Sequence, residues 1–261
     1  MNYLIKPKIA RKNGQYYRYH HFLFGYYLPF LLNTNPSFND NYLFYDCEKL
    51  NSILLDTPHY NVTILANQTD IQNKYEILSF LGFDGPYNPG LTQSKIELIN
   101  EKINNLYNIT YDSNQEDYIL LIDRGRLDHS NNKKYKKQTP SERRSIMNTK
   151  DTYMSLNKIY PTKIVQLDDL SLLEQIILFR NARIVIAQHG AALSNIIFCN
   201  PYTKIIEIIN NRISSNRLQG VWFDKLYKIY NRSHIKYNTK NSHPILNIQN
   251  IQKSIKFLIN N

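Results

Sequence analysis

The 261-residue chain has few cysteines and no long apolar segment. Its two cysteines, Cys47 and Cys199, cannot supply the disulfide framework of a small stapled secreted domain. No run reaches the roughly 18 apolar residues that a membrane-spanning helix needs. The start of the chain has neither the apolar segment nor the small-residue cleavage site of a secretory signal. We therefore expect a cytoplasmic protein without a transmembrane segment, in the host cytoplasm if the chain is viral.

Acidic residues are also in short supply. The chain carries 32 Lys and Arg against 21 Asp and Glu, which gives a formal net charge of +11. Such a charge attracts anions, and it leaves open nucleic acid, a membrane surface and a phosphorylated small molecule as partners. The abundance of Asn, Ile, Lys and Tyr is what AT-rich codons produce, so part of the lysine excess has no functional meaning.

Strand-like and helix-like segments alternate along the chain, which predicts an α/β protein with parallel sheets. We predict strands at residues 42–46, 61–65, 117–123, 163–167, 183–187 and 203–209. We predict helices at 48–55, 93–106, 170–181, 191–198, 221–229 and 248–259. The core side of the 170–181 helix is expected to be Leu172, Leu173, Ile176, Ile177 and Phe179. The pattern favours two Rossmann-like domains, a reduced one at 1–110 and a second one at 111–261.

The most informative segment is 183–195, in which a buried strand ends at a glycine and a helix begins at once. Parallel sheets bind ligands beyond the carboxyl ends of their strands, where helix N-termini offer N–H groups and a partial positive charge. The segment therefore predicts an anion site, formed by His189, Gly190, Ala191, Ser194 and Asn195. The alternative is an ordinary turn in which His189 has a structural role.

Two further features belong to the same edge of the predicted sheet. Arg124 directly follows a buried strand, and its planar guanidinium suits a diphosphate. Arg144 belongs to a second basic group downstream, while the lysines between them, at 133–137, read as a solvated loop. Glu207 interrupts an apolar strand and must have a partner there. That partner is either a helix N-terminus or the hydroxyls of a ribose.

These residues carry a resemblance to the family 61 glycosyltransferases. Segment 173–195 resembles that family's core, which ends in His-Gly-Ala-x-Leu-Thr/Ser-Asn. Asp123-Arg124, residues 144–148, Glu207 and the segment 223–230 also fall where the family has its motifs. Near the N-terminus, His20 takes the position of the family histidine, whereas Tyr17 and Phe24 stand where the family has an asparagine and an acid.

The resemblance implies a GT-B fold, in which two Rossmann-like domains face a cleft. It implies an inverting glycosyltransferase of glycan biosynthesis that moves a hexosyl, pentosyl or N-acetylhexosaminyl group from a nucleotide-sugar, which we expect to be UDP-linked. The acceptor would be a hydroxyl on a glycan or protein. Arg124, Arg144, His189 and the 190–195 turn would hold the diphosphate, Glu207 would bind the ribose, and His20 or His21 would be the catalytic base. The Asp-x-Asp motif of metal-dependent glycosyltransferases is absent, so we expect no metal and no cofactor.

Two other functions stay open. Because Phe24 replaces the family's acid, the chain could bind a nucleotide-sugar without transferring the sugar. The net charge also permits a nucleic-acid-binding protein, but no basic face with interleaved aromatics and no known nucleic-acid module is evident. We therefore expect no nucleic-acid partner.

Overall fold

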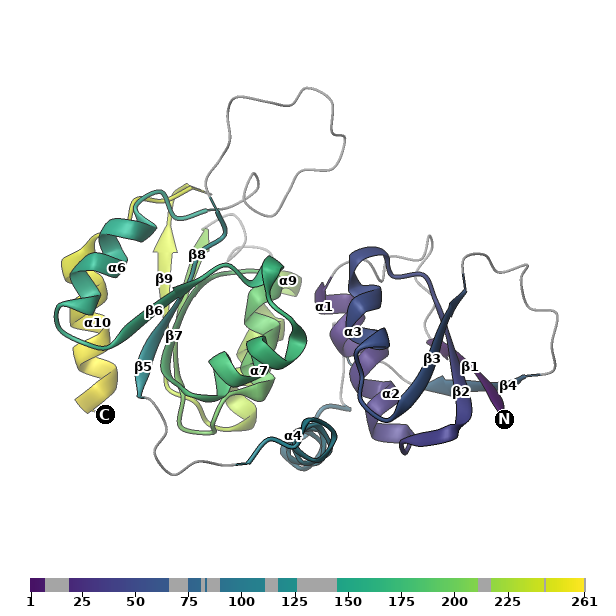
Figure 1. Ribbon diagram of the computed structural model, residues 1–261. Helices are drawn as coiled ribbons and strands as arrows, with labels where there is room; N and C mark the ends of the chain where they lie inside the picture. Colours follow the sequence, from purple (N-terminus) through teal and green to yellow (C-terminus); the bar gives the residue numbers. More distant parts are fainter. Residues whose placement is uncertain are drawn as a thin grey trace, which may run out of the picture. The chain divides into compact units, whose positions relative to one another are not determined.

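The chain forms two compact units, Met1–Asp112 and Ser113–Asn261, each built on one parallel sheet (Figure 1). The boundary expected from the sequence was at residue 110. The computed structural model describes residues 1–7, 19–65, 75–80, 83, 90–110, 117–125, 145–210, 217–241 and 243–260. Each unit is described by itself below.

The sheet of the first unit has four parallel strands in the order β3-β2-β1-β4. Strands β2 (Ser37–Tyr45) and β3 (Tyr60–Leu65) confirm the two strands predicted for this part of the chain. The sequence did not predict β1 (Asn2–Pro7) or β4 (Glu76–Phe80). The sheet of this unit therefore has two strands more than the sequence predicted.

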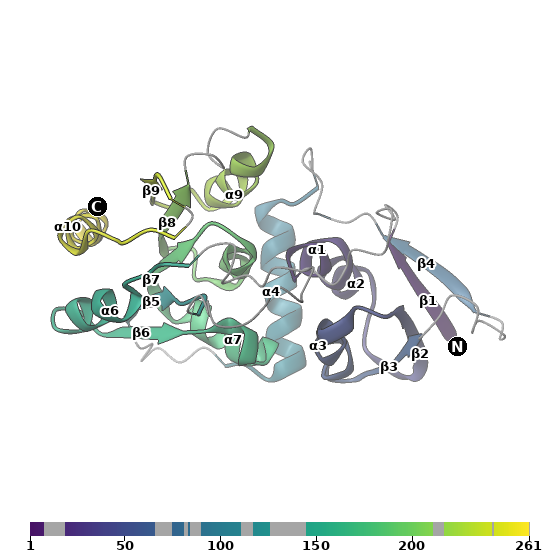
Figure 2. The ribbon, with the colours of Figure 1, turned by 90° about the horizontal axis from the view of Figure 1, so that it is seen from above.

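The described helices of this unit lie on one side of the sheet (Figure 2). They are α1 (Tyr19–Phe22), the π-helical segment η2 (Leu23–Tyr27), α2 (Leu28–Asn33), the 3-10 turn η3 (Glu48–Leu50), α3 (Asn51–Leu55) and α4 (Gln93–Tyr107). Helix α4 begins where the Thr92 side chain accepts a hydrogen bond from the Lys95 N–H, and it ends at Asn108 in a left-handed conformation. Its buried face is the predicted one, with Ile96, Ile99, Ile103 and Leu106.

The sheet of the second unit has five parallel strands in the order β6-β5-β7-β8-β9. They are β5 (Tyr118–Ile122), β6 (Thr162–Val165), β7 (Ala182–Gln188), β8 (Lys204–Asn210) and β9 (His234–Thr239). All five residues of β5 are buried, as expected for a strand covered on both faces. Strand β9, at the edge of the sheet, was not predicted.

Helices cover both faces of this sheet (Figures 1 and 2). Helices α6 (Thr149–Asn157) and α10 (Ile248–Asn260) pack on one face, where Ile186, Ile206 and Ile255 share one apolar core. Helices α7 (Leu172–Arg180) and α9 (Arg217–Ile229) lie on the other face. Both contact a 3-10 helix, η5 (Ala191–Phe198), which has the bounds predicted for an α-helix.

The predicted core side of α7 is only partly right. Leu172, Ile176 and Phe179 are buried, but Ile177 is 42% exposed. Two polar residues of α7 that were not predicted to be buried, Gln175 and Arg180, are buried in the structure. Gln175 can be buried because its Nε2 donates to the carbonyls of Leu167 and Leu170, at 3.2 and 3.0 Å.

The strand order creates a topological switch point between β5 and β7. From β5 the chain crosses to β6 on one side, and it then returns to place β7 on the other side. In open parallel sheets the crevice beyond the carboxyl ends of two such strands is the usual ligand site. The residues that follow β5 and β7 are therefore the first place to look for function. The GT-B arrangement of the two units stays a prediction.

Candidate functional site

Arg124 and Gly190 meet at the switch point. Arg124 lies two residues beyond the end of β5, and Gly190 lies two residues beyond the end of the neighbouring strand β7. The Arg124 guanidinium occupies the space above the Gly190 Cα so closely that a side chain there would collide with Nη1. Gly190 also has a φ of +158°, which residues with a Cβ rarely adopt. The glycine is therefore required for the approach of the arginine.

The loop that carries Arg124 is held by Asp123. The Asp123 carboxylate accepts hydrogen bonds from the Gly125 N–H at 3.1 Å and from the Gln166 side chain at 3.3 Å. The backbone N–H of Asp123 continues the strand pairing by donating to the carbonyl of Val165 at 2.8 Å. Arg124 thus follows a stretch of backbone that these hydrogen bonds hold in place.

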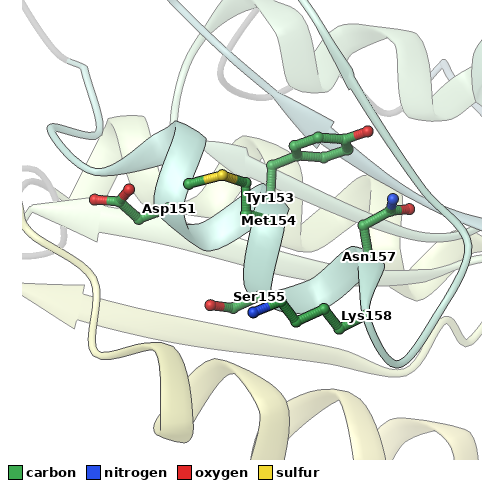
Figure 3. A pocket seen from close by; sticks show the side chains of 6 residues that line it. All are labelled: Asp151, Tyr153, Met154, Ser155, Asn157 and Lys158. Carbon is green, nitrogen blue, oxygen red and sulfur yellow. The ribbon is translucent and has the colours of Figure 1, made fainter.

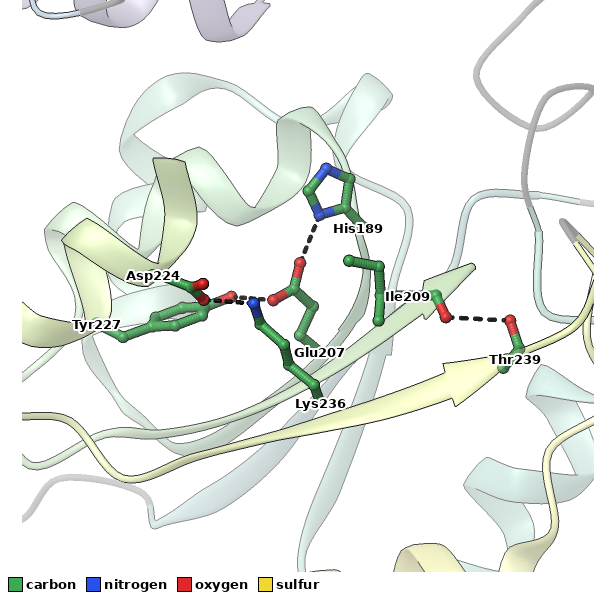
Figure 4. Close-up of polar contacts among 7 residues, drawn as sticks. All are labelled: His189, Glu207, Ile209, Asp224, Tyr227, Lys236 and Thr239. Carbon is green, nitrogen blue, oxygen red and sulfur yellow. Dashed lines mark hydrogen bonds and ion pairs between the residues drawn. The ribbon is translucent and has the colours of Figure 1, made fainter. Parts of the chain in front are cut away.

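His189 lies at one end of a buried hydrogen-bond chain (Figure 4). Its Nδ1 lies 2.5 Å from Oε1 of Glu207 on β8. The second carboxylate oxygen, Oε2, accepts a hydrogen bond of 3.0 Å from the hydroxyl of Tyr227 on α9. His189 is 6% exposed and Glu207 is 1% exposed. The Phe223 ring packs edge-on against the imidazole, with centroids 5.2 Å apart, and fixes its plane.

The proton on Tyr227 is well defined. Burial, and then the nearby Glu207 carboxylate, raise the pKa of Tyr227 well above its usual value. The hydroxyl therefore stays protonated and acts as the donor to Glu207. Beside this pair, Lys236 on β9 forms an ion pair of 2.5 Å with Asp224 on α9.

The 3-10 helix η5 begins directly at this turn. Its first internal hydrogen bond runs from the Leu193 N–H to the Gly190 carbonyl, at 3.0 Å. The N–H groups of Gly190, Ala191 and Ala192 precede that bond and have no acceptor within the helix. Ala191 and Ala192 are half-buried and carry only methyl groups, which leaves their backbone approachable.

Ser194 and Asn195 were predicted to contact the anion, and both are fully buried. The Asn195 side chain donates to the Gln175 side chain at 2.8 Å and so ties η5 to α7. A direct contact with a ligand stays a prediction for both residues, and their burial favours a role in holding the turn.

His20 and His21, the predicted catalytic candidates, lie on α1 in the first unit. Both are half-exposed, and their rings are 5.3 Å apart. The His20 ring also contacts the fully buried Phe24, at 5.3 Å between centroids. Neither histidine is enclosed in the aromatic core, so both keep surface for a substrate.

Other predicted basic residues, Arg144 and the lysines at 133–137, lie outside the described residues. Figure 3 shows a surface hollow elsewhere on the second unit. None of the predicted site residues lines this hollow. Its lining comes from α6 and from the residue that caps the end of that helix: Asp151, Tyr153, Met154, Ser155, Asn157 and Lys158. The hollow therefore does not compete with the switch point as a candidate site.

The described part of the chain has neither a cluster of three metal-binding side chains nor a thiol with a lowered pKa. No group of three or more His, Cys, Asp and Glu side chains there could hold a metal ion. Burial raises the pKa of the Cys47 thiol to about 12 and that of Cys199 to about 11. These thiols stay protonated near neutral pH and make poor nucleophiles. Among the same residues, no helix has the length and apolar character needed to cross a bilayer.

Sequence reasoning missed Tyr227 as part of the site. The signal was there, because a carboxylate in the apolar strand β8 needs partners and α9 follows that strand in the sequence. Which α9 side chain reaches Glu207 depends on how the helix lies on the sheet, and only the structure gives that.

Comparison with known proteins supplies the family. A search of curated proteins finds no match to this chain. The family model described as Glycosyltransferase 61 matches residues 19–206, which is more than half of the chain. The matched region contains His20, Arg124 and the whole of the His189 turn. The chain belongs to glycosyltransferase family 61.

Proposed function

We propose that the protein is an inverting glycosyltransferase that uses a nucleotide-sugar donor. The observation that carries the proposal is the closeness of Arg124 to Gly190 at the switch point, with His189 and the start of η5 beside it. A guanidinium, an imidazole and N–H groups that have no acceptor within their helix together match the charge and the acceptor oxygens of a diphosphate.

The donor diphosphate would bind where these groups converge. Arg124 can make two parallel charge-assisted hydrogen bonds to one phosphate. The N–H groups at 190–192 would donate hydrogen bonds to oxygens of the other phosphate, as N–H groups at helix N-termini commonly do. Arg144 would add a second cation. We propose a UDP-linked hexosyl, pentosyl or N-acetylhexosaminyl donor, and a hydroxyl on a glycan or protein as the acceptor.

In the proposed reaction the acceptor oxygen attacks the anomeric carbon from the face opposite the diphosphate. The new carbon–oxygen bond forms as the bond to the β-phosphate oxygen breaks, and its electron pair leaves with the nucleotide diphosphate. A base takes the acceptor proton. Arg124 and the backbone donors stabilise the charge that develops on the diphosphate. His20 or His21 is our candidate for the base, since both are half-exposed and Phe24 has no carboxylate.

A metal ion is not part of the proposal, because the sequence has no Asp-x-Asp motif to hold one on the diphosphate. The test is transfer measured in EDTA. Unchanged transfer supports the proposal, and loss of transfer that Mn²⁺ restores contradicts it.

Glu207 has a different proposed role from the one its sequence position suggested. Ribose recognition stays a prediction, but the carboxylate is 1% exposed and both of its oxygens have protein partners. We propose that Glu207 acts through His189.

The experiment that tests the donor site is a thermal-shift screen with UDP, GDP, CMP and their sugars. A ligand that binds only the folded protein raises Tm in proportion to the logarithm of its concentration over Kd. We expect one nucleotide series to raise Tm, and Arg124→Ala to abolish the shift. Arg183→Ala is the matched control, because Arg183 is an exposed arginine near the start of β7, paired only on the surface with Asp117. Equal shifts in the two variants would refute the role of Arg124.

A second candidate is a family member that binds the donor without transferring the sugar. The observation in its favour is Phe24, a fully buried aromatic side chain where the family has an acid. Donor binding with neither transfer nor donor hydrolysis would support this candidate over the enzyme.

A further inference from the structure

The Tyr227–Glu207–His189 hydrogen-bond chain links α9 to β8 and to the turn that follows β7. All three side chains are buried, and each hydrogen bond uses a different atom of the carboxylate. A carboxylate with a purely structural role could accept hydrogen bonds from any donor and would not need the imidazole ring of a histidine as its partner. Here one oxygen is committed to the imidazole at the edge where the ligand is expected.

The directions of these hydrogen bonds follow from the donors present. Tyr227 keeps its proton and donates to Oε2. With Glu207 as a carboxylate, Oε1 only accepts, so Nδ1 of His189 must carry a hydrogen. The other ring nitrogen, Nε2, points away from Glu207 in Figure 4. The chain therefore selects one of the two imidazole tautomers.

We propose that Tyr227 and Glu207 are positioning residues, which hold His189 in the tautomer with hydrogen on Nδ1 and present Nε2 to the leaving diphosphate. This inference rests on the proposed function. When Nε2 takes a proton, the Glu207 carboxylate offsets the charge of the ring, and Nε2 then donates to a phosphate oxygen. The other charged groups nearby are Arg124, which lies against Gly190, and the Lys236–Asp224 pair beside Tyr227.

Glu207→Gln gives a sharp test because the amide cannot satisfy both neighbours as the carboxylate does. The Tyr227 hydroxyl still donates, so it forms its hydrogen bond with the amide oxygen of the new side chain at position 207. The amide NH₂ then faces Nδ1, which must become an acceptor, and the hydrogen moves to Nε2. Tyr227→Phe leaves the carboxylate in place and should keep the native tautomer. Tyr118→Phe is the matched control. It removes the hydroxyl of a buried tyrosine at the start of β5, which donates to the Leu178 carbonyl at 2.8 Å.

The first measurement is nitrogen NMR of the full-length protein with isotope-labelled histidine. It is made over a series of pH values, and the tautomer is determined from the signals of the neutral ring. His189→Gln identifies the His189 signals among the seven histidines. We expect hydrogen on Nδ1 in the wild type, Tyr227→Phe and Tyr118→Phe, and on Nε2 in Glu207→Gln. Hydrogen on Nε2 in the wild type, or no change in Glu207→Gln, would overturn the inference.

The second measurement is the affinity for UDP by calorimetry. We expect binding about 10-fold weaker in Glu207→Gln, about 3-fold weaker in Tyr227→Phe and unchanged in Tyr118→Phe. If Glu207→Gln does not fold, equal affinities of Tyr227→Phe and Tyr118→Phe overturn the inference. If the tautomers are as predicted but the affinity for UDP does not differ between the variants, the inference is also overturned. The proposed function is not affected by that result. A wild type that binds none of UDP, GDP and CMP contradicts the proposed function, while the tautomer still decides the role of the hydrogen-bond chain.

Discussion

Replacing Gly190 with alanine tests whether the glycine exists to admit Arg124. The added Cβ would collide with Nη1 of Arg124 and lie 3.4 Å from Cζ and 3.7 Å from Nη2. The guanidinium is the far end of a flexible side chain, so it can swing aside at small steric cost. It would then leave the switch point, where the donor diphosphate is proposed to bind.

The expected magnitudes differ for stability and for binding. The φ of +158° at Gly190 strains an alanine, and such strain costs about 1–3 kcal/mol of unfolding free energy. A hydrogen bond to a charged group is worth about 1.5–3 kcal/mol, so loss of the Arg124 contact should weaken UDP binding about 10- to 100-fold. Denaturant unfolding and calorimetry measure the two effects separately.

A double-mutant cycle decides whether Arg124 is the cause. If Gly190→Ala acts by displacing the guanidinium, it should weaken UDP binding strongly in the wild type and hardly at all in an Arg124→Ala background. An equal loss in both backgrounds would refute this reasoning, because the glycine would then act on the ligand independently of the arginine.

Three further predictions concern buried groups and a helix end. Cys47 and Cys199, whose pKa values burial raises to about 12 and about 11, should resist Ellman's reagent at pH 8 until the chain is unfolded, and rapid native reaction would contradict their burial. Burial also raises the pKa values of Tyr27 and Tyr227. The unfolded chain loses these protons near pH 10, so the stability they contribute is complete below about pH 10 and falls above it. Urea midpoints between pH 9 and 11 should show the fall, a smaller one in Tyr27→Phe, and a rising midpoint would contradict it. Ser171→Ala removes the capping box of α7, and denaturant unfolding should register a loss of about 1 kcal/mol with UDP affinity unchanged.

The parts of the fold that were predicted correctly are those with a strong pattern. Strands β5 and β7 are near-continuous apolar runs, and α4 repeats isoleucine at helical spacing. Strand β9 was missed because it lies at a sheet edge, where Thr239 alone of its six residues is buried, and because it contains the charged Lys236. Strand β1 was missed because Lys6 and Pro7 weaken the pattern of a central strand.

The sequence predicted where the candidate site residues lie in the fold, but not which side chains they contact. The sequence placed Arg124 and His189 at one sheet edge, because both directly follow buried strands. It could not show that Arg124 fills the space above Gly190, which depends on side-chain conformation. It also could not pair Glu207 with Tyr227, because that contact arises from the packing of α9 on β8. Neighbouring strands can be inferred from chain order, whereas side-chain partners depend on tertiary packing.

The most direct test of the central claim is a crystal structure with the nucleotide diphosphate that stabilises the protein most. We predict its β-phosphate at the carboxyl ends of β5 and β7, within hydrogen-bond distance of the Arg124 guanidinium and His189 Nε2, with the α-phosphate near the N–H of Ala191. A diphosphate bound at any other edge of the sheet, or bound without contact to Arg124, would contradict it.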